Sequence, residues 1–218
     1  MDKKFELTDE TILFDGRILN RIRALIDIKG TFVRKGDLGG FVEKEENLSH
    51  EGNCWIYNNA CVYADARVSG NAYVYGNAWV SDDAHISGYA RVSGNAYVYD
   101  NAHVYDDARV CDNARVCDNA HVYGNAHISG NMGICIDAKI TSNNDVCSIS
   151  LFGSRDDHTT FFRCKDDTIK VKCGCFVGTL DKFRDKVKET HGDNQYAKEY
   201  LAIADVVELR LNRKNEVE

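Results

Sequence analysis

The sequence predicts a mainly β protein with a parallel β-helix at its centre, because two observations agree on a repeat of six residues. Alanine recurs at every sixth position from Ala60 to Ala126. Valine or isoleucine lies two residues after each of these positions, in a series that runs from Ile56 to Ile140. The alternation of apolar and polar residues predicts a short strand, and the Gly-Asn, Asp-Asn and Asp-Asp pairs that follow predict a turn. Each unit is therefore expected to form one strand and one corner.

Strands this short cannot bury their apolar residues alone, so the units are expected to stack as a solenoid with one shared core. With three units in each coil, eighteen residues form one rung, and neighbouring rungs lie about 4.8 Å apart. Residues 54–140 then form about five rungs. A helix is excluded, because a period of six does not place alanine and valine on one helical face. The repeat domain is expected to span residues 48–142.

The N-terminal segment, residues 1–47, is expected to form a β cap over the first rung. Two apolar-rich stretches between Phe5 and Ile28 flank Asp15-Gly16, a favoured two-residue hairpin turn. A cap is needed because an open solenoid end exposes strand edges. Gly36, Gly39 and Gly40 indicate an irregular link from the hairpin into the coil.

Residues 143–218 are expected to form a small α+β domain with three strands and two helices. The strands are predicted at residues 145–153, 159–165 and 169–177, with a turn at Asp166-Asp167. Thr179 is a candidate N-cap for a helix that runs through Glu189, and Asn194 is a candidate N-cap for a second helix that runs through Arg213.

Composition limits the function and the setting of the protein. The net charge of -7 disfavours a general nucleic-acid binder, and no apolar segment is long enough to span a membrane. The charged N-terminus lacks the apolar region of a signal peptide, so a cytoplasmic location is expected. The nine cysteines are odd in number and scattered, which favours reduced thiols over disulfides.

No catalytic residue, metal site or cofactor is predicted. The tail contains ligand types that zinc prefers, but their spacing is not that of a zinc knuckle, and buried thiols are the favoured interpretation. These residues are His158, Cys164, Cys173, Cys175 and His191. In particular, Cys173 and Cys175 are expected to face the same side of one strand.

The repeat resembles the left-handed parallel β-helix of hexapeptide-repeat proteins, and this resemblance is the source of the left hand. The flanking words GRILNRIRAL, KGDLGGFVEKEENLS, HTTFFR, IKVKCGCFVGTL and KETHGDN are similar to those of a family of uncharacterised phage and prophage proteins. The resemblance covers nearly the whole chain. It implies a fold, a phage or prophage context inside a bacterial host cell, and a homo-oligomer, with a trimer as one form, but no established activity.

Candidate ligand-binding residues lie at the outward positions of the repeat, where residues eighteen apart are expected to stack in columns. One column contains Arg67, His85, His103, His121 and Lys139; a second contains Tyr73, Arg91, Arg109 and His127; a third contains Cys61, Trp79, Tyr97 and Arg115. Cationic ladders flanked by aromatic rings suit an anionic ligand such as a nucleotide. In the tail, Arg163, with Lys170 and Lys172 near Thr159 and Thr160, is a further candidate anion pocket.

The simplest alternative is that these side chains only keep the strands soluble and paired, and many outward tyrosines favour packing between subunits. Three classes of function remain open. The first is a non-enzymatic binding protein, in its most specific form a counter-defence protein that sequesters a small nucleotide signal. The second is an acyltransferase that uses acyl-coenzyme A, although no loop interrupts residues 54–140 to shape an active site. The third is a structural scaffold.

Overall fold

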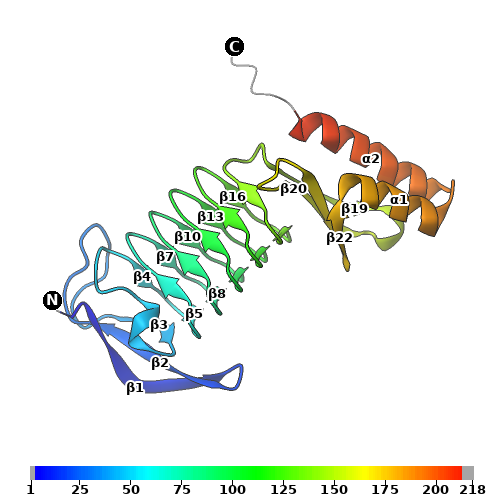
Figure 1. Ribbon diagram of the computed structural model, residues 1–218. Coiled ribbons are helices and arrows are strands. Elements are labelled where there is room, and N and C mark those ends of the chain that lie inside the picture. The colour runs from blue at the N-terminus through cyan, green and yellow to red at the C-terminus, as the bar shows by residue number, and fades with distance from the viewer. Residues whose placement is uncertain (1–2, 213–218) are drawn as a thin grey trace, which may run out of the picture.

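The protein is built around a β-solenoid of about six turns, with a β-hairpin at its N-terminal end and a small α+β domain at its C-terminal end (Figure 1). The computed structural model describes residues 3–212. The predicted fold class is confirmed: the solenoid strands form parallel sheets, and each sheet is one of the three faces of the coil.

The three faces are named here after the side chains that they carry outward. The histidine face contains β6 (Arg67–Val68), β9 (His85–Ile86), β12 (His103–Val104), β15 (His121–Val122) and β18 (Lys139–Ile140). The arginine face contains β4 (Trp55–Ile56), β7 (Tyr73–Val74), β10 (Arg91–Val92), β13 (Arg109–Val110) and β16 (His127–Ile128). The aromatic face contains β5 (Cys61–Val62), β8 (Trp79–Val80), β11 (Tyr97–Val98), β14 (Arg115–Val116) and β17 (Gly133–Ile134).

The core of the solenoid consists of the two apolar series of the repeat. Each strand pairs in register with the strand eighteen residues further along, as Val98 does with Val116, so like side chains stack on like. Every repeat alanine from Ala60 to Ala126 is fully buried, and so is the aliphatic residue of every solenoid strand. The β-branched side chains suit a pleated wall, and alanine leaves room where the chain turns.

The corners explain why aspartate is so frequent in the repeat. Asp100 and Asp118 have positive φ angles of 55° and 56°, a left-handed conformation that Asp tolerates better than most residues. Each carboxylate accepts a hydrogen bond from a backbone N–H of the next rung: Asp118 N lies 3.2 Å from Asp100 Oδ2, and Ile136 N lies 2.8 Å from Asp118 Oδ2. These carboxylates therefore connect successive coils.

The predicted N-terminal hairpin is confirmed. Strands β1 (Phe5–Phe14) and β2 (Arg17–Ala24) pair in antiparallel fashion around Asp15 and Gly16. Lys4 is buried at the first rung, where its ammonium group lies 3.0 Å from the carbonyl oxygen of Cys54.

The predicted link after the hairpin is irregular through Gly36, but Gly39 and Gly40 lie in a strand. Strand β3 (Leu38–Val42) joins the hairpin to the aromatic face, because β2 pairs with it on one side and β5 pairs in parallel on the other. A short 3-10 turn, η1 (Glu45–Asn47), follows, and Leu48 pairs with Val68. The solenoid thus begins about one turn before residue 54. Gly40 is required there, because a Cβ atom would lie 2.5 Å from the carbonyl oxygen of Ala60.

The C-terminal domain has four strands where the sequence predicts three. These are β19 (Val146–Phe152), β20 (Asp157–Arg163), β21 (Ile169–Cys173) and β22 (Phe176–Thr179), with a 3-10 turn η2 (Gly153–Arg155) after β19. The chain reverses at Gly174, which has a φ of 58°, and Cys173 pairs with Phe176. Cys173 and Cys175 therefore do not lie on one strand, and the prediction of a shared side was wrong.

Two helices cover this sheet, and both predicted N-caps are confirmed. Helix α1 (Leu180–His191) begins after Thr179, and helix α2 (Gln195–Leu211) begins after Asn194. The cap oxygens accept hydrogen bonds from the N–H groups of Lys182 and Ala197. The predicted helix end at Arg213 lies outside the described residues. Within residues 3–212, no helix is long and apolar enough to cross a membrane.

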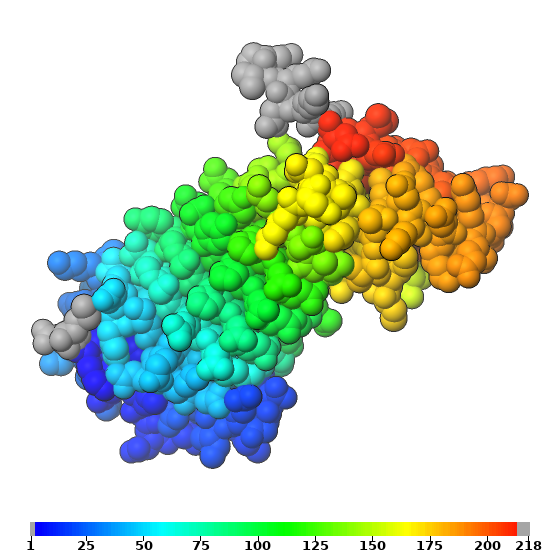
Figure 2. Space-filling view, viewed as in Figure 1, coloured from blue at the N-terminus to red at the C-terminus, as the bar shows by residue number. Residues whose placement is uncertain are grey.

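The C-terminal domain lies directly on the last coils (Figure 2). Ala138 forms a backbone bridge with Cys164, and the ammonium group of Lys170 lies 2.5 Å from a carboxylate oxygen of Asp137. Lys170 therefore secures the domain interface.

Candidate ligand-binding site

The structure places the predicted columns in register, one on each face of the solenoid. Arg91 pairs with Tyr73 and Arg109, and His103 pairs with His85 and His121. The faces point in different directions, so the cationic ladders and the aromatic rings of different columns do not meet in one site. Each face is a separate candidate.

The histidine face carries a stack of imidazole rings. The ring centroids of His85 and His103 lie 5.1 Å apart, and those of His103 and His121 lie 4.8 Å apart, in both cases nearly parallel. Burial lowers the pKa of His103, with smaller contributions from His85 and Lys165. Burial, Lys165 and His103 likewise lower the pKa of His121.

The N-terminal end of this face carries groups of both signs. A hollow of about 620 Å³ is lined by Arg67 and His85 but also by Glu45 and Glu46. Glu45 already contacts His50, at 2.7 Å. An anion would meet two carboxylates in this hollow, so this end of the face is the weaker half of the candidate.

The arginine face contains a thiol–imidazole pair that the sequence reasoning missed. Cys111 Sγ lies 3.3 Å from His127 Nε2. The two residues are sixteen positions apart and touch diagonally between neighbouring rungs. Columns of residues eighteen apart do not contain such a pair. Burial and Asp112 raise the pKa of Cys111, which opposes the thiolate that a nucleophile requires.

The aromatic face is bounded by both ends of the molecule. Phe14, at the hairpin turn, packs edge-on against Trp79 with ring centroids 4.3 Å apart, and Trp79 contacts Tyr97 at 4.4 Å. The guanidinium carbon of Arg115 lies 5.6 Å from the centroid of the Tyr97 ring. A hollow of about 320 Å³ lies over these side chains. Cys61 is buried under the hairpin and is not available to a ligand.

A second hollow, of about 350 Å³, lies where the aromatic face meets the C-terminal domain. Gly133 takes the outward position of the column there, and the side chain of Lys172 lies across it: a Cβ atom on Gly133 would be 2.6 Å from Lys172 Cδ. Arg115, Asn131 and His158 also line this hollow. Sequence analysis predicted Lys172 only as a neighbour of Arg163, because the repeat does not reveal how the tail docks.

Arg163 is held by contacts within the C-terminal domain. Its guanidinium group lies 3.6 Å from Asp145 and donates to the backbone carbonyls of Asp167 and Leu211. Thr159 and Thr160 are buried and Lys170 pairs with Asp137; of the predicted pocket residues, Thr160 and Lys172 meet, and they line the second hollow rather than surround Arg163.

Within the described residues, the solenoid and the cap differ in whether their cationic side chains form ion pairs. All three arginines of β2 pair with carboxylates: Arg17 with Glu43, Arg21 with Glu10 and Arg23 with Glu6. By contrast, the permanently charged outward side chains of the solenoid strands have no carboxylate oxygen within 4.0 Å among residues 3–212. They are Arg67, Arg91, Arg109, Arg115 and Lys139.

Most outward tyrosines are less exposed than the sequence suggests. Tyr63 is buried beneath Phe14, and the rings of Tyr105 and Tyr123 stack at 4.7 Å, so that each covers the other. Tyr75 and the corner residue Tyr89 are exposed, at 38% and 61%. The exposed aromatic surface is therefore smaller than the number of outward tyrosines in the sequence predicts.

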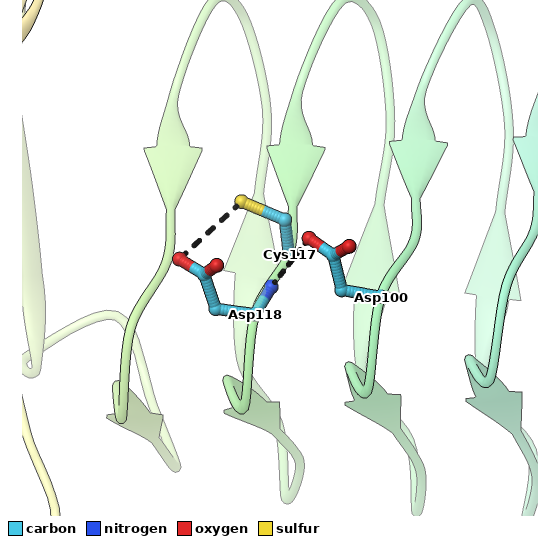
Figure 3. A group of neighbouring side chains, drawn as sticks. All are labelled: Asp100, Cys117 and Asp118. Carbon is cyan, nitrogen blue, oxygen red and sulfur yellow. Dashed lines mark hydrogen bonds between the residues drawn. The ribbon is translucent and has the colours of Figure 1, made fainter.

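Two groups of side chains have the chemistry of metal ligands, and of the zinc-type residues considered in the tail they include only Cys164. Asp100, Cys117 and Asp118 meet at one corner of the solenoid (Figure 3). Asp137, Cys164 and Asp166 meet at the domain interface. Asp118 and Asp100 already accept the backbone hydrogen bonds of the next rung, and Asp137 pairs with Lys170, so carboxylates in both groups have structural partners.

Cys117 of the first group and Cys135 are buried thiols that directly follow the adjacent strands β14 and β17. The interaction between the two thiols lowers the pKa of Cys117 and, together with burial, raises that of Cys135. The tail residues themselves are dispersed: His158 contacts Ser150 and Asn131, His191 contacts Ser154, and Cys175 is exposed.

The fold defines a β-solenoid protein that carries a β-hairpin cap at its N-terminal end and a small α+β domain at its C-terminal end. Four stretches of the solenoid match the sequence model of the YdcK beta solenoid repeat, at residues 66–82, 90–106, 108–124 and 114–130. These matches lie within the run of parallel two-residue strands, and they show similarity to a repeat family of β-solenoids. No curated protein matches the chain.

Proposed function

We propose that this chain is a non-enzymatic binding protein that holds a small anionic ligand on the outward face of its solenoid. The observation that carries the proposal is the set of solenoid cations without carboxylate partners in the described structure, beside a cap whose β2 arginines are all paired. Unpaired arginines on neighbouring strands repel one another, and an anion between them would relieve that repulsion.

The neighbouring rings add a second type of contact. Arg115 lies over Tyr97, and the imidazole stack of the histidine face offers further ring surfaces. Cations beside aromatic rings suit ligands that combine phosphate with a nucleobase. In its most specific form, the proposal is that the protein sequesters a small nucleotide signal.

The biological setting follows from the flanking words. Their similarity to phage and prophage proteins supports a setting inside a bacterial host cell, where removal of a nucleotide signal would counter a defence response. A homo-oligomer, with a trimer as one form, would bring solenoid faces of different subunits together and enclose a ligand more fully.

Acyl transfer from acyl-coenzyme A has less support. The strands follow one another every six residues from β4 to β18, so no inserted loop covers a substrate along these coils. The thiol of Cys111, which has a histidine beside it, has a raised pKa.

The experiment is a thermal-shift screen followed by calorimetry, with cyclic dinucleotides, nucleotide-ribose signals and acyl-coenzyme A as probes. At least one nucleotide probe should stabilise the protein and bind in a one-site isotherm. One outward side chain from each face is then replaced, as Arg91→Gln, His103→Gln and Arg115→Gln, with Arg17→Gln in the cap as the matched control.

At least one of the three face variants should weaken binding about tenfold, because it loses a charge-assisted hydrogen bond, and the cap variant should not. Stabilisation by acyl-coenzyme A alone would overturn the proposal in favour of an acyltransferase. Equal affinity in all four variants, or no binding of any probe, would also overturn it.

A further inference from the structure

The aromatic face differs from the other two because a structure from another part of the chain closes it at each end. The hairpin reaches it at Phe14, and the C-terminal domain reaches it at Lys172. The two hollows on this face, of about 320 and 350 Å³, share one lining residue, Arg115. They therefore adjoin at Arg115, and the two together are called the trough here, with an aromatic half and a cationic half.

We propose that this trough binds a nucleoside phosphate, with the base against Trp79 and Tyr97 and the phosphate between Arg115 and Lys172. The assignment rests on the function proposed above and identifies the face, the residues and the orientation of the ligand. It differs from the predicted columns because Lys172 and His158 come from the C-terminal domain.

The aromatic half offers ring surface that the protein covers only in part. Trp79 and Tyr97 are half-buried, and Tyr63 and Tyr99 line the same hollow. Phe14 fixes the Trp79 ring from the hairpin side, so its orientation is set before a ligand arrives. A base stacked on such rings gains stability whatever its identity, because every base has a π face.

The cationic half combines permanent charge with neutral donors. Lys172 and Arg115 approach the hollow from different domains, and Asn113 donates to Asn131 across the same wall. His158 is oriented from both sides, by Ser150 and Asn131. Two cations with several hydrogen-bonding groups match the charge and the oxygen atoms of a phosphate.

Two carboxylates line the trough, and both have partners. Asp82 accepts a hydrogen bond from Ser81 Oγ at 2.8 Å, in the aromatic half. Asp157 lies 3.4 Å from Arg155, in the cationic half. The acid in the cationic half is thus offset by its own arginine, and Arg115 and Lys172 remain to attract an anion.

The spacing also fits an elongated ligand. Tyr97 and Gly133 lie on strands two steps apart in the same sheet, which is about 9.6 Å at the usual strand separation. A ligand with a ring at one end, a linker and an anionic group at the other end follows this order. A nucleoside phosphate has that order: base, sugar and phosphate.

The test uses the full chain with three probes in parallel: adenosine 5′-monophosphate, adenosine and inorganic phosphate. Calorimetry measures affinity, and tryptophan fluorescence locates the base. Of the two tryptophans, Trp55 is fully buried, so stacking on Trp79 should quench the exposed part of the emission. The monophosphate should bind at least about tenfold more tightly than either fragment, with quenching, because it makes both sets of contacts.

The decisive variant is Lys172→Met, which keeps the aliphatic stem over Gly133 and removes only the charge. Its affinity for the monophosphate should fall about tenfold, and Arg115→Gln should have a similar effect. Lys188→Met, at an exposed position of helix α1, is the matched control and should bind as the unchanged protein does. Melting temperatures check that each variant is folded.

If the monophosphate binds but Lys172→Met and Arg115→Gln leave its affinity intact, the trough is not the site, although anion binding by another face stands. Binding without quenching would overturn the placement of the base. If neither this probe nor the nucleotide panel binds, the function proposed above fails together with this inference.

Discussion

The two ends of the solenoid are attached in different ways. At the N-terminal end, β3 continues the aromatic face, and the cap residues Phe5, Ile22 and Val33 belong to the same buried cluster as the coils. At the C-terminal end, Phe161, Phe183 and Val207 form a separate core, and only a few residues, among them Phe162, reach into the solenoid. The N-terminal end is therefore part of the solenoid, and the C-terminal end is a domain docked on it.

The difference indicates how each end prevents edge-to-edge association of coils. An exposed rung offers unpaired backbone groups to another chain. The cap closes its end by adding strands and a buried lysine, Lys4, whereas the C-terminal domain covers the other end with β20 and the contacts of Lys165 and Lys170. A change in either region should reveal whether its stability is shared with the coils.

The largest effect is expected from Val98→Asp in the middle of the solenoid. Val98 is fully buried, and a carboxylate there would have no partner, which should cost at least about 4 kcal/mol. Because the cap shares this core, coils and cap should lose hydrogen-exchange protection together, while α1 and α2 keep theirs. Ser87→Asp, at an outward position, is the control and should be nearly neutral. Retained protection in the cap would contradict the shared core.

The next comparison removes one fully buried phenylalanine from each end. Phe5→Ala and Phe161→Ala should each cost about 3–5 kcal/mol. Phe5→Ala should lower the melting temperature of the whole solenoid in one transition, because its cluster includes the coils. Phe161→Ala should instead split thermal unfolding, followed by circular dichroism, into an early helical step and an unchanged β step. A solenoid transition lowered equally by both variants would show that the two ends are equivalent.

A finer comparison uses two glycines. In Gly40→Ala the added Cβ meets the backbone oxygen of Ala60 at 2.5 Å, and the strand must shift, with an expected cost of about 1–3 kcal/mol. In Gly133→Ala the Cβ meets the flexible chain of Lys172 at 2.6 Å, which can move, so the cost should be under about 1 kcal/mol. Denaturant midpoints measure both. Equal losses would mean that Lys172 is held as rigidly as a backbone.

The smallest effect concerns acid on the histidine face. The pKa values of His103 and His121 are lowered in the folded protein. As the pH decreases below the ordinary value of 6.5, the unfolded chain therefore binds protons before the native state does. The free energy of unfolding decreases over this range until the pH is below the native pKa values. Lys165→Met should raise both pKa values and reduce this loss, as measured by nuclear magnetic resonance titration. Unchanged pKa values would show that Lys165 does not influence the stack.

The repeat predicted the solenoid faces because its fixed period places any two residues that are eighteen positions apart side by side, as with Tyr97 and Arg115. The start of the solenoid was missed because β3 pairs with β5 at a separation of twenty residues and lacks the alanine phase. Gly174 divides residues 169–177, which the sequence predicts as one strand, into β21 and β22. The trough was not predicted as a unit, because the contact of Lys172 with Gly133 depends on docking between distant segments, which no local pattern encodes.

The unbroken spacing of eighteen residues also makes the solenoid a molecular ruler. Deletion of one coil, for example residues 84–101, would join two equivalent strand positions and bring the hairpin closer to the C-terminal domain by about 4.8 Å. The distance between Phe14 and Lys172 is thus set in whole rungs rather than continuously. Natural or engineered relatives with one coil more or fewer would change the length of ligand that fits in steps of one rung, and the deletion named here would also remove Tyr97 from the trough.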